Sequence, residues 1–241
     1  MSIVSRFIDI IKTNKADLSS AIPRAYNRYQ IANHPAFFLV FPNGEESHIR
    51  DIGFGGFSMD YKQTIDIEKN KQYQVTLYAL DQKCSFQVVP SWHTQKSIGL
   101  NIVHENMIGM TFLKPIIEGF KLGYSLKEHK SSSPEKNLTK IFKVNNDTFI
   151  EFDSNTLEGT FKFPNLENKY NQINFTESGL ECWEIEPKDK EQKNKNTNRR
   201  NELDILRAGS YILIAFIASG KETNLQPWLV KIISHLQNQK K

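Results

Sequence analysis

Apolar residues recur at helical spacing in the first dozen positions of the chain. Charged residues such as Arg6 and Asp9 stand between them, so one side of a helix would be apolar and the other polar. The apolar positions are Ile3, Val4, Phe7, Ile8, Ile10 and Ile11. This pattern predicts a short amphipathic helix in an N-terminal segment that covers residues 1–19.

Between residues 29 and 106 the pattern changes to short runs rich in Phe, Val, Ile and Tyr. Turn residues such as Pro42, Asn43 and Gly44 separate the runs, which cover residues 36–41, 48–52, 73–80, 85–89 and 97–103. Short strands at this spacing are typical of a small antiparallel barrel or sandwich. The sequence therefore predicts a β-barrel domain over residues 20–106.

Helical periodicity returns between Met107 and His129, where apolar residues are spaced by three and four positions. Pro115 must then lie in the first turn of this helix or kink it, because proline cannot donate the backbone hydrogen bond of a helix interior. A serine cluster followed by Pro134 ends the pattern. Residues 107–137 are therefore expected to form a connecting helix and a linker.

The remainder of the chain, residues 138–241, predicts a second β-rich domain. Five apolar runs have the length of strands and cover residues 140–144, 148–152, 159–163, 172–175 and 180–185. Residues 187–201 are charged and polar without a large apolar side chain, so they are expected to form a disordered loop. The fold class predicted for the whole chain is mostly β.

Composition and charge narrow the class of protein. Charged residues make up 24% and hydrophobic residues 39%, as in an average soluble domain. The net charge of +4 is only a mild bias towards anionic partners, and basic residues alternate with acidic ones, so binding to a nucleic-acid duplex is not expected. The longest apolar run, residues 211–218, is shorter than the roughly 20 residues of a membrane span. No signal peptide is recognisable, and a cytoplasmic protein is expected.

No motif predicts catalysis or a cofactor. Cys84 and Cys182 are far apart and lack metal-ligand spacing, so they are expected to be free thiols. The six histidines are scattered, and H-E-x-x-H, G-x-S-x-G and P-loop patterns are missing from the sequence. We therefore expect neither a catalytic residue, nor a metal, nor a cofactor, and the chain is not predicted to be an enzyme.

Two short motifs instead point to a binding site. Arg24 and Arg28 form R-x-x-x-R in the loop before the first predicted strand. Further along, Asp51, Gly53 and Gly56 form D-x-G-x-x-G between two strands. Taken singly, a glycine stretch of this kind is more often a tight turn or bulge, and an exposed arginine pair is more often solvated surface. The order and spacing of the two motifs make a joint function the favoured interpretation.

Together with the closing strand at Ser97–Ile102, these motifs resemble the signature of the PilZ domain. That family has R-x-x-x-R in an N-terminal loop, then D/N-x-S-x-x-G, then a closing strand in which a glycine is followed by alternating apolar residues. The resemblance extends over Ile22–Glu105. It implies a six-stranded β-barrel that binds the bacterial second messenger cyclic di-GMP, commonly as a stacked dimer.

The residue types suit the ligand that the resemblance implies. A guanidinium group can stack on a purine and donate two parallel hydrogen bonds to guanine or phosphate, which would be the role of Arg24 and Arg28. Asp51 would accept hydrogen bonds from the guanine edge. Gly53 and Gly56 would let the backbone approach the ligand and offer amide donors. Gly53 departs from the family pattern, which has serine there, and the missing hydroxyl is expected to weaken binding about tenfold without abolishing it.

The second half of the chain has a related motif, in which Asn174, Thr176 and Gly179 form N-x-T-x-x-G. One interpretation is a second, degenerate barrel of the same kind, with residues 212–217 as a buried strand. The rival interpretation makes residues 202–218 a helix in an unrelated α+β module, and periodicity does not separate the two. No arginine occurs between Arg50 and Arg199, so this half is not expected to bind the nucleotide in the same way.

Two functions remain as hypotheses. The first is a cyclic di-GMP receptor that transmits ligand occupancy to a protein partner of unknown identity. The alternative is a degenerate PilZ-fold adaptor that binds protein partners without nucleotide. The missing serine, and the lack of a counterpart of the Arg24/Arg28 pair beside the second motif, favour the alternative, whereas the two motifs together favour the first.

Overall fold

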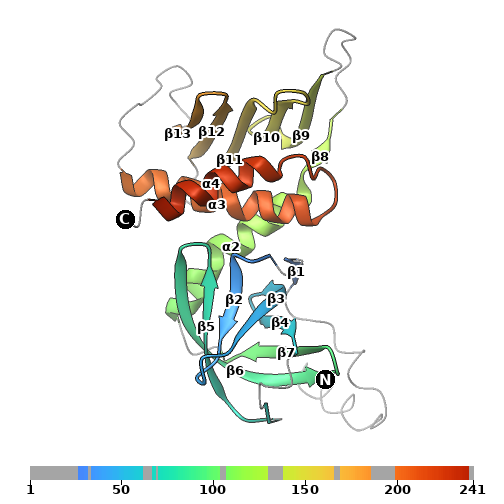
Figure 1. The fold of residues 1–241 in the computed structure, drawn as a ribbon, viewed down its shortest axis with the longest axis vertical. Helices are drawn as coiled ribbons and strands as arrows, with labels where there is room; N and C mark the ends of the chain where they lie inside the picture. The colour runs from blue at the N-terminus through green and yellow to red at the C-terminus, as the bar shows by residue number, and fades with distance from the viewer. Residues whose placement is uncertain are drawn as a thin grey trace, which may run out of the picture.

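A computed structural model of the chain describes residues 27–31, 34–61, 67–68, 70–103, 107–129, 138–165, 169–185 and 199–238. The helix expected within residues 1–19 and the side chain of Arg24 lie outside the described residues. The described chain forms two β-sheet structures at opposite ends of an elongated molecule, with three helices between them (Figure 1).

The N-terminal sheet closes into a barrel, as the sequence predicts. Its strands are β1 (Tyr29–Gln30), β2 (Phe37–Val40), β3 (Glu46–Gly53), β4 (Gly56–Asp60), β5 (Tyr73–Ala79), β6 (Gln82–His93) and β7 (Ser97–Ile102). The order β3-β2-β5-β6-β7-β4 returns to β3 through the β3–β4 pairing, so six antiparallel strands form a ring. β1 pairs with the end of β3, beyond the part that pairs with β2.

Alternation of apolar and polar residues places the barrel core. Every second side chain of β5 is buried, at Val75, Leu77 and Ala79, and Phe86 and Val88 of β6 are buried in the same way. Burying an apolar side chain of this size contributes roughly 1.5–3 kcal/mol. The strand pattern read from the sequence is therefore the pattern that fills the barrel.

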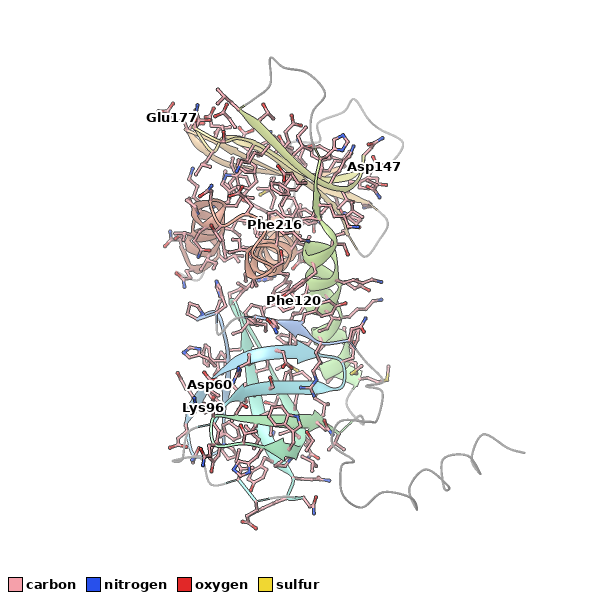
Figure 2. All side chains as sticks on the ribbon, turned by 90° about the vertical axis from the view of Figure 1, so that its right-hand side faces the viewer. Asp60, Lys96, Phe120, Asp147, Glu177 and Phe216 are labelled. Atoms are coloured by element: carbon pink, nitrogen blue, oxygen red, sulfur yellow. The ribbon has the colours of Figure 1, made fainter. Side chains whose placement is uncertain are left out.

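Helix α2 (Met107–Ser125) leads from the barrel to the second sheet. Pro115 lies inside this helix and not in its first turn, so the first of the two expected placements is wrong and a kink at Pro115 stays a prediction. Phe120 lies where α2 meets both the barrel and helix α3 (Arg199–Ala218), with its ring 5.6 Å from that of Phe37 and 6.4 Å from that of Tyr211 (Figure 2).

The second sheet is an open antiparallel meander. Its strands are β8 (Lys127–Glu128), β9 (Thr139–Asn145), β10 (Thr148–Asp153), β11 (Gly159–Pro164), β12 (Tyr170–Thr176) and β13 (Gly179–Ile185), and each pairs with its neighbours in the sequence. Helices α3 and α4 (Gln226–Asn238) lie along the side of the sheet that faces the barrel (Figure 1). Trp228 of α4 stacks on Phe175 of β12 with ring centroids 3.9 Å apart.

The expected buried strand at residues 212–217 is wrong, because this segment lies in α3. Ile212, Leu213 and Ile214 are all buried, although they face different sides of the helix. A helix that is apolar all round is one that is covered on all sides, and α3 lies between α2, the barrel and the second sheet. The second half therefore forms an open sheet with helices and not a second barrel. This agrees with the rival interpretation, in which residues 202–218 form a helix of an α+β module.

The polar segment expected to be a loop over residues 187–201 lies mostly outside the described residues. Its last three residues, 199–201, belong to the first turn of α3. The expected end of the loop at residue 201 is therefore wrong, because the helix already begins at Arg199. None of the described helices is both long and apolar enough to cross a membrane.

Candidate functional site

Strand register brings three of the predicted site residues together. Tyr29 of β1 is opposite Ile52 of β3, and Gln30 is opposite Asp51. Continuing this antiparallel register by one position places Arg28 beside Gly53. The structure therefore places Arg28, the second arginine of R-x-x-x-R, beside the D-x-G-x-x-G motif at the end of β3.

Arg28 and Asp51 form an ion pair at this point. Nη1 of Arg28 donates to Oδ1 of Asp51 at 3.0 Å, and the two side chains are 13% and 24% exposed. The hydroxyl of Ser58, which is opposite Asp51 on β4, donates to the second carboxylate oxygen. Asp51 is thus held between a cation and a buried hydroxyl, with its orientation fixed from both sides.

Gly53 is needed because the chain passes directly against it. A Cβ atom at this position would lie 2.5 Å from the backbone oxygen of Asn27 and 3.2 Å from Cγ of Arg28. A side chain here would push the Arg28 segment away from β3. The departure from serine thus has a local cause, which is the close approach of residues 27–28.

Gly56 approaches the chain on the other side of the hairpin. Its φ of +148° is one that L side chains rarely adopt, and an added Cβ would lie 2.0 Å from the backbone oxygen of Leu100 in β7. Both glycines therefore contact the protein's own backbone, and their expected contact with a ligand stays a prediction.

A hollow of about 570 Å³ opens beside Arg28. It is lined from the barrel by Asn27, Arg28, Tyr29 and Gln30, from the end of α2 by Tyr124, and from the end of α3 by Ala218 and Ser219. The hollow therefore lies where the barrel, α2 and α3 meet, and one arginine and two tyrosines line it.

The two tyrosines of the hollow contact each other. The rings of Tyr29 and Tyr124 are 5.8 Å apart and tilted by 41°, and the Tyr124 hydroxyl donates to the backbone oxygen of Gln30 at 3.0 Å. Burial raises the pKa of the Tyr124 hydroxyl, which keeps it in the protonated form that makes this bond. Tyr124 thus fixes the end of α2 to β1 next to Arg28.

Lys221 holds the end of α2 from the other half of the molecule. Its Nζ donates to the backbone oxygens of Tyr124 and Leu126, both at 2.6 Å. Burial, and then the positive charge of Lys127, lower the pKa of Lys221. A cation at carbonyl groups that end a helix is a favourable capping arrangement. Through this contact the segment after α3 is tied to the wall of the hollow.

Sequence reasoning missed Ser58, Tyr29 and Tyr124 as part of this site. Ser58 lies on the opposite face of β4 from the core residues Phe57 and Met59, so the alternation of apolar residues does not indicate its role. Its hydroxyl is buried because Asp51 on the neighbouring strand supplies the hydrogen-bond partner that a buried hydroxyl needs. Tyr124 is 94 residues from its partner Gln30, and no local pattern indicates that contact. Arg24, the other predicted ligand of the site, lies outside the described residues.

The described residues also bear on a metal centre and on a disulfide. Within it, no three acidic, histidine or cysteine side chains are grouped closely enough to hold a metal ion. Cys84 and Cys182 are free thiols, as expected. No protein-family model matches the chain, and a search of curated proteins finds no similar protein.

Proposed function

We propose that this protein is a PilZ-type receptor that binds cyclic di-GMP beside Arg28 and transmits its presence to a protein partner. The observation that carries the proposal is the assembly of Arg28, Asp51 and Gly53 at one end of a closed six-stranded barrel. These residues come from the two motifs on which the family resemblance rests.

Arg28 can serve both as an anion ligand and as a stacking surface. Its ion pair with Asp51 uses Nη1, and the guanidinium fork has donors on Nε and Nη2 as well. A phosphate or a guanine edge can be bound by such a fork in a bidentate manner. Asp51 holds the guanidinium in place and carries acceptors for guanine N–H groups.

The hollow beside Arg28 supplies aromatic surface and a route for transmission. Tyr29 and Tyr124 offer rings on which a purine can stack, which is worth about 1–3 kcal/mol per base in nucleic-acid complexes. Ala218 and Ser219 belong to the end of α3, so a ligand in the hollow would contact both halves of the molecule. Occupancy would then favour one arrangement of α3 and the second sheet relative to the barrel.

A specific observation favours the alternative, an adaptor of the same fold that binds partners without nucleotide. The space beside Gly53 and Gly56 is occupied by the backbone of Asn27 and Leu100, and Asp51 neutralises Arg28. A ligand that uses these glycines would have to displace part of the chain. The two functions differ in one measurable property, which is heat of binding with cyclic di-GMP.

The test is isothermal titration calorimetry of the full chain with cyclic di-GMP. Arg28→Ala and Arg24→Ala are each expected to weaken binding at least tenfold, because a charge-assisted hydrogen bond contributes roughly 1.5–3 kcal/mol. Arg50→Ala is the matched control. Arg50 neighbours Asp51 in the sequence, but it is half exposed and pairs with Asp60 at 3.7 Å, so its loss should change affinity by less than about twofold.

Absence of heat with the wild-type protein would overturn the receptor proposal. Recovery of one protein partner equally well with and without the nucleotide would then support the adaptor. Equal affinity of the wild type and Arg28→Ala would show that the nucleotide binds elsewhere on the chain and would also contradict the proposed site.

A further inference from the structure

A second and larger cavity lies in the other half of the molecule, between α2, α3 and one end of the second sheet. Its volume is about 700 Å³, which is in the range of small-molecule sites. None of the described residues that line it lines the hollow beside Arg28. It is therefore a separate cavity, and what it binds does not depend on the function proposed above.

One wall of this cavity is apolar. Pro115 and Leu122 of α2 face it, and Ile205, Ala208 and Ile212 of α3 complete this wall. Ile205 and Ile212 are almost fully buried. Such a surface binds the apolar body of a ligand and excludes water from its contacts.

The opposite wall interrupts an apolar sheet face with a polar residue. The face of β12 that packs on the helices carries Asn171, Ile173 and Phe175, all buried. Asn171 is opposite Phe163 on β11 and Glu184 on β13. A leucine at position 171 would continue the apolar row, so the asparagine places a carboxamide at the edge of the cavity that packing alone does not require.

Two of the described residues that line this cavity carry a buried polar atom without a hydrogen-bond partner. Among the described residues, three buried side-chain oxygens have no hydrogen-bond partner, and two of these, Asn171 Oδ1 and the Tyr211 hydroxyl, belong to residues that line it. Asn171 is 3% and Tyr211 1% exposed. Burial raises the pKa of the Tyr211 hydroxyl, with a further contribution from Asp81, so this group stays protonated. Buried polar atoms without partners are rare in native proteins, and a ligand is one way to supply the missing partner.

The charges around the cavity balance. Three lining residues are cationic and three are anionic: Lys121, Lys169, Arg207, Glu118, Glu184 and Asp204. Two of the cations are paired within the lining itself, Arg207 with Asp204 at 2.7 Å and Lys169 with Glu184 at 3.8 Å. A lining of this kind gives no net attraction for an anion such as a phosphate or for a cation.

We infer that this cavity binds a small uncharged molecule that has an apolar body and an amide-like edge. The carboxamide of Asn171 carries an acceptor and a donor side by side, which is complementary to the adjacent N–H and C=O groups of a primary amide, a lactam or a nucleobase edge. The apolar body would lie against α2 and α3. This chemistry is distinct from that of an anionic cyclic dinucleotide.

Ligand-observed saturation-transfer NMR on the full chain tests the inference with three probes that share one ring. Benzamide has the amide edge, methyl benzoate has the same ring without an N–H donor, and benzoate is an anion. Benzamide is expected to bind in the millimolar range. Methyl benzoate and benzoate should bind at least about fivefold more weakly, as expected for the loss of one hydrogen bond.

Three variants locate the binding. Asn171→Leu should weaken benzamide about fivefold, and Ala208→Trp, which fills the space between α3 and the sheet, should remove binding. Asn174→Leu is the matched control, because Asn174 lies on the opposite face of the same strand and bonds to Thr160 and Gln172. It should leave the affinity unchanged.

Two results with the wild-type protein would overturn the inference. One is the lack of a benzamide signal with the wild type at about 10 mM. The other is equal affinity of the wild type for benzamide and methyl benzoate, a comparison that does not depend on whether a variant folds. Circular dichroism of the variants confirms that a loss of binding is local, and equal benzamide affinity of folded Asn171→Leu and wild type would also contradict the assignment.

Discussion

The structure gives a local reason for the glycine at position 53, where the PilZ pattern that the sequence resembles has serine. The pattern has serine there, and the sequence alone suggests that glycine simply removes a useful hydroxyl. In the structure the backbone oxygen of Asn27 occupies the place of a side chain. The hydroxyl nearest to Asp51 comes from Ser58 on the neighbouring strand. Glycine at position 53 is thus the residue that lets Arg28 lie against β3.

Introducing the serine of the PilZ pattern at position 53 should therefore weaken the site. Gly53→Ser is expected to destabilise the protein by about 1–3 kcal/mol, as overpacking of a filled site usually does, and to lower the affinity for cyclic di-GMP. Gly53→Ala, which adds the Cβ without the hydroxyl, is the control and should behave alike. Urea unfolding and calorimetry check this. Tighter binding by Gly53→Ser than by Gly53→Ala would instead indicate that the hydroxyl contacts the ligand.

At the scale of elements, the two similar motifs, residues 51–56 and 174–179, share the structure of a hairpin turn. The sheets that contain them differ, because one closes into a barrel and the other is open. Each motif forms a β-hairpin in which Gly53 is paired with Gly56, or Thr176 with Gly179. The glycine that ends each motif has nearly the same φ, +148° at Gly56 and +147° at Gly179. The sequence similarity therefore reflects one type of tight turn used twice, which explains why it suggests a repeated domain that is not formed.

The two hairpin glycines should differ in how well they tolerate a side chain. Gly179→Ala introduces only backbone strain, because no atom lies within 4 Å of the added Cβ, and should cost about 1–3 kcal/mol. Gly56→Ala adds a contact of 2.0 Å with Leu100 to the same strain and should cost clearly more. Thermal unfolding of both variants compares them. An equal loss of stability would mean that β4 can move away from β7 at little cost.

The elements that the sequence predicted well are those whose pattern has a single explanation. The barrel strands alternate over several residues, and α2 keeps its periodicity from Met107 to Ser125. The segment Ile212–Ile217 is apolar at every position, which fits a buried strand as well as a buried helix. Whether this segment is a strand or a helix depends on the elements around it. It forms part of α3, which is covered by α2 on one side and by the second sheet on the other. Contacts across long sequence distances, such as that of Tyr124 with Gln30, could not be predicted either, because they too depend on how distant elements pack together.

At the scale of the whole molecule, a buried ion pair joins the barrel to the second half. Arg207 of α3 makes two hydrogen bonds, of 2.9 and 2.7 Å, to the carboxylate of Asp81, which lies in the turn between β5 and β6. The side chain of Asp81 is 8% exposed and that of Arg207 17%. Together with the Phe37, Phe120 and Tyr211 rings, this pair fixes how α3 lies on the barrel. Any signal passing from the hollow at Arg28 to the second sheet would act on this junction.

Breaking the Arg207–Asp81 ion pair should lower the stability of the protein far more than removing Asp204, the exposed second partner of Arg207. Asp81→Asn is expected to destabilise the protein by about 3–5 kcal/mol, because it leaves the Arg207 charge largely buried without its main partner. Asp204→Asn removes the other carboxylate on Arg207, which is 62% exposed, and should cost less than about 1 kcal/mol. Chemical denaturation, followed by circular dichroism, measures the free energy of unfolding of both variants. Equal losses would show that Asp81 has no special role at the junction.

The central claim, that the barrel binds cyclic di-GMP beside Arg28, is tested most directly by titrating the fluorescently labelled nucleotide with the full wild-type chain. The account predicts saturable binding with a Kd below about 10 μM, reversed by unlabelled cyclic di-GMP and not by an equal concentration of GMP. A signal that does not saturate at protein concentrations up to about 1 mM, or that GMP reverses equally well, would contradict it.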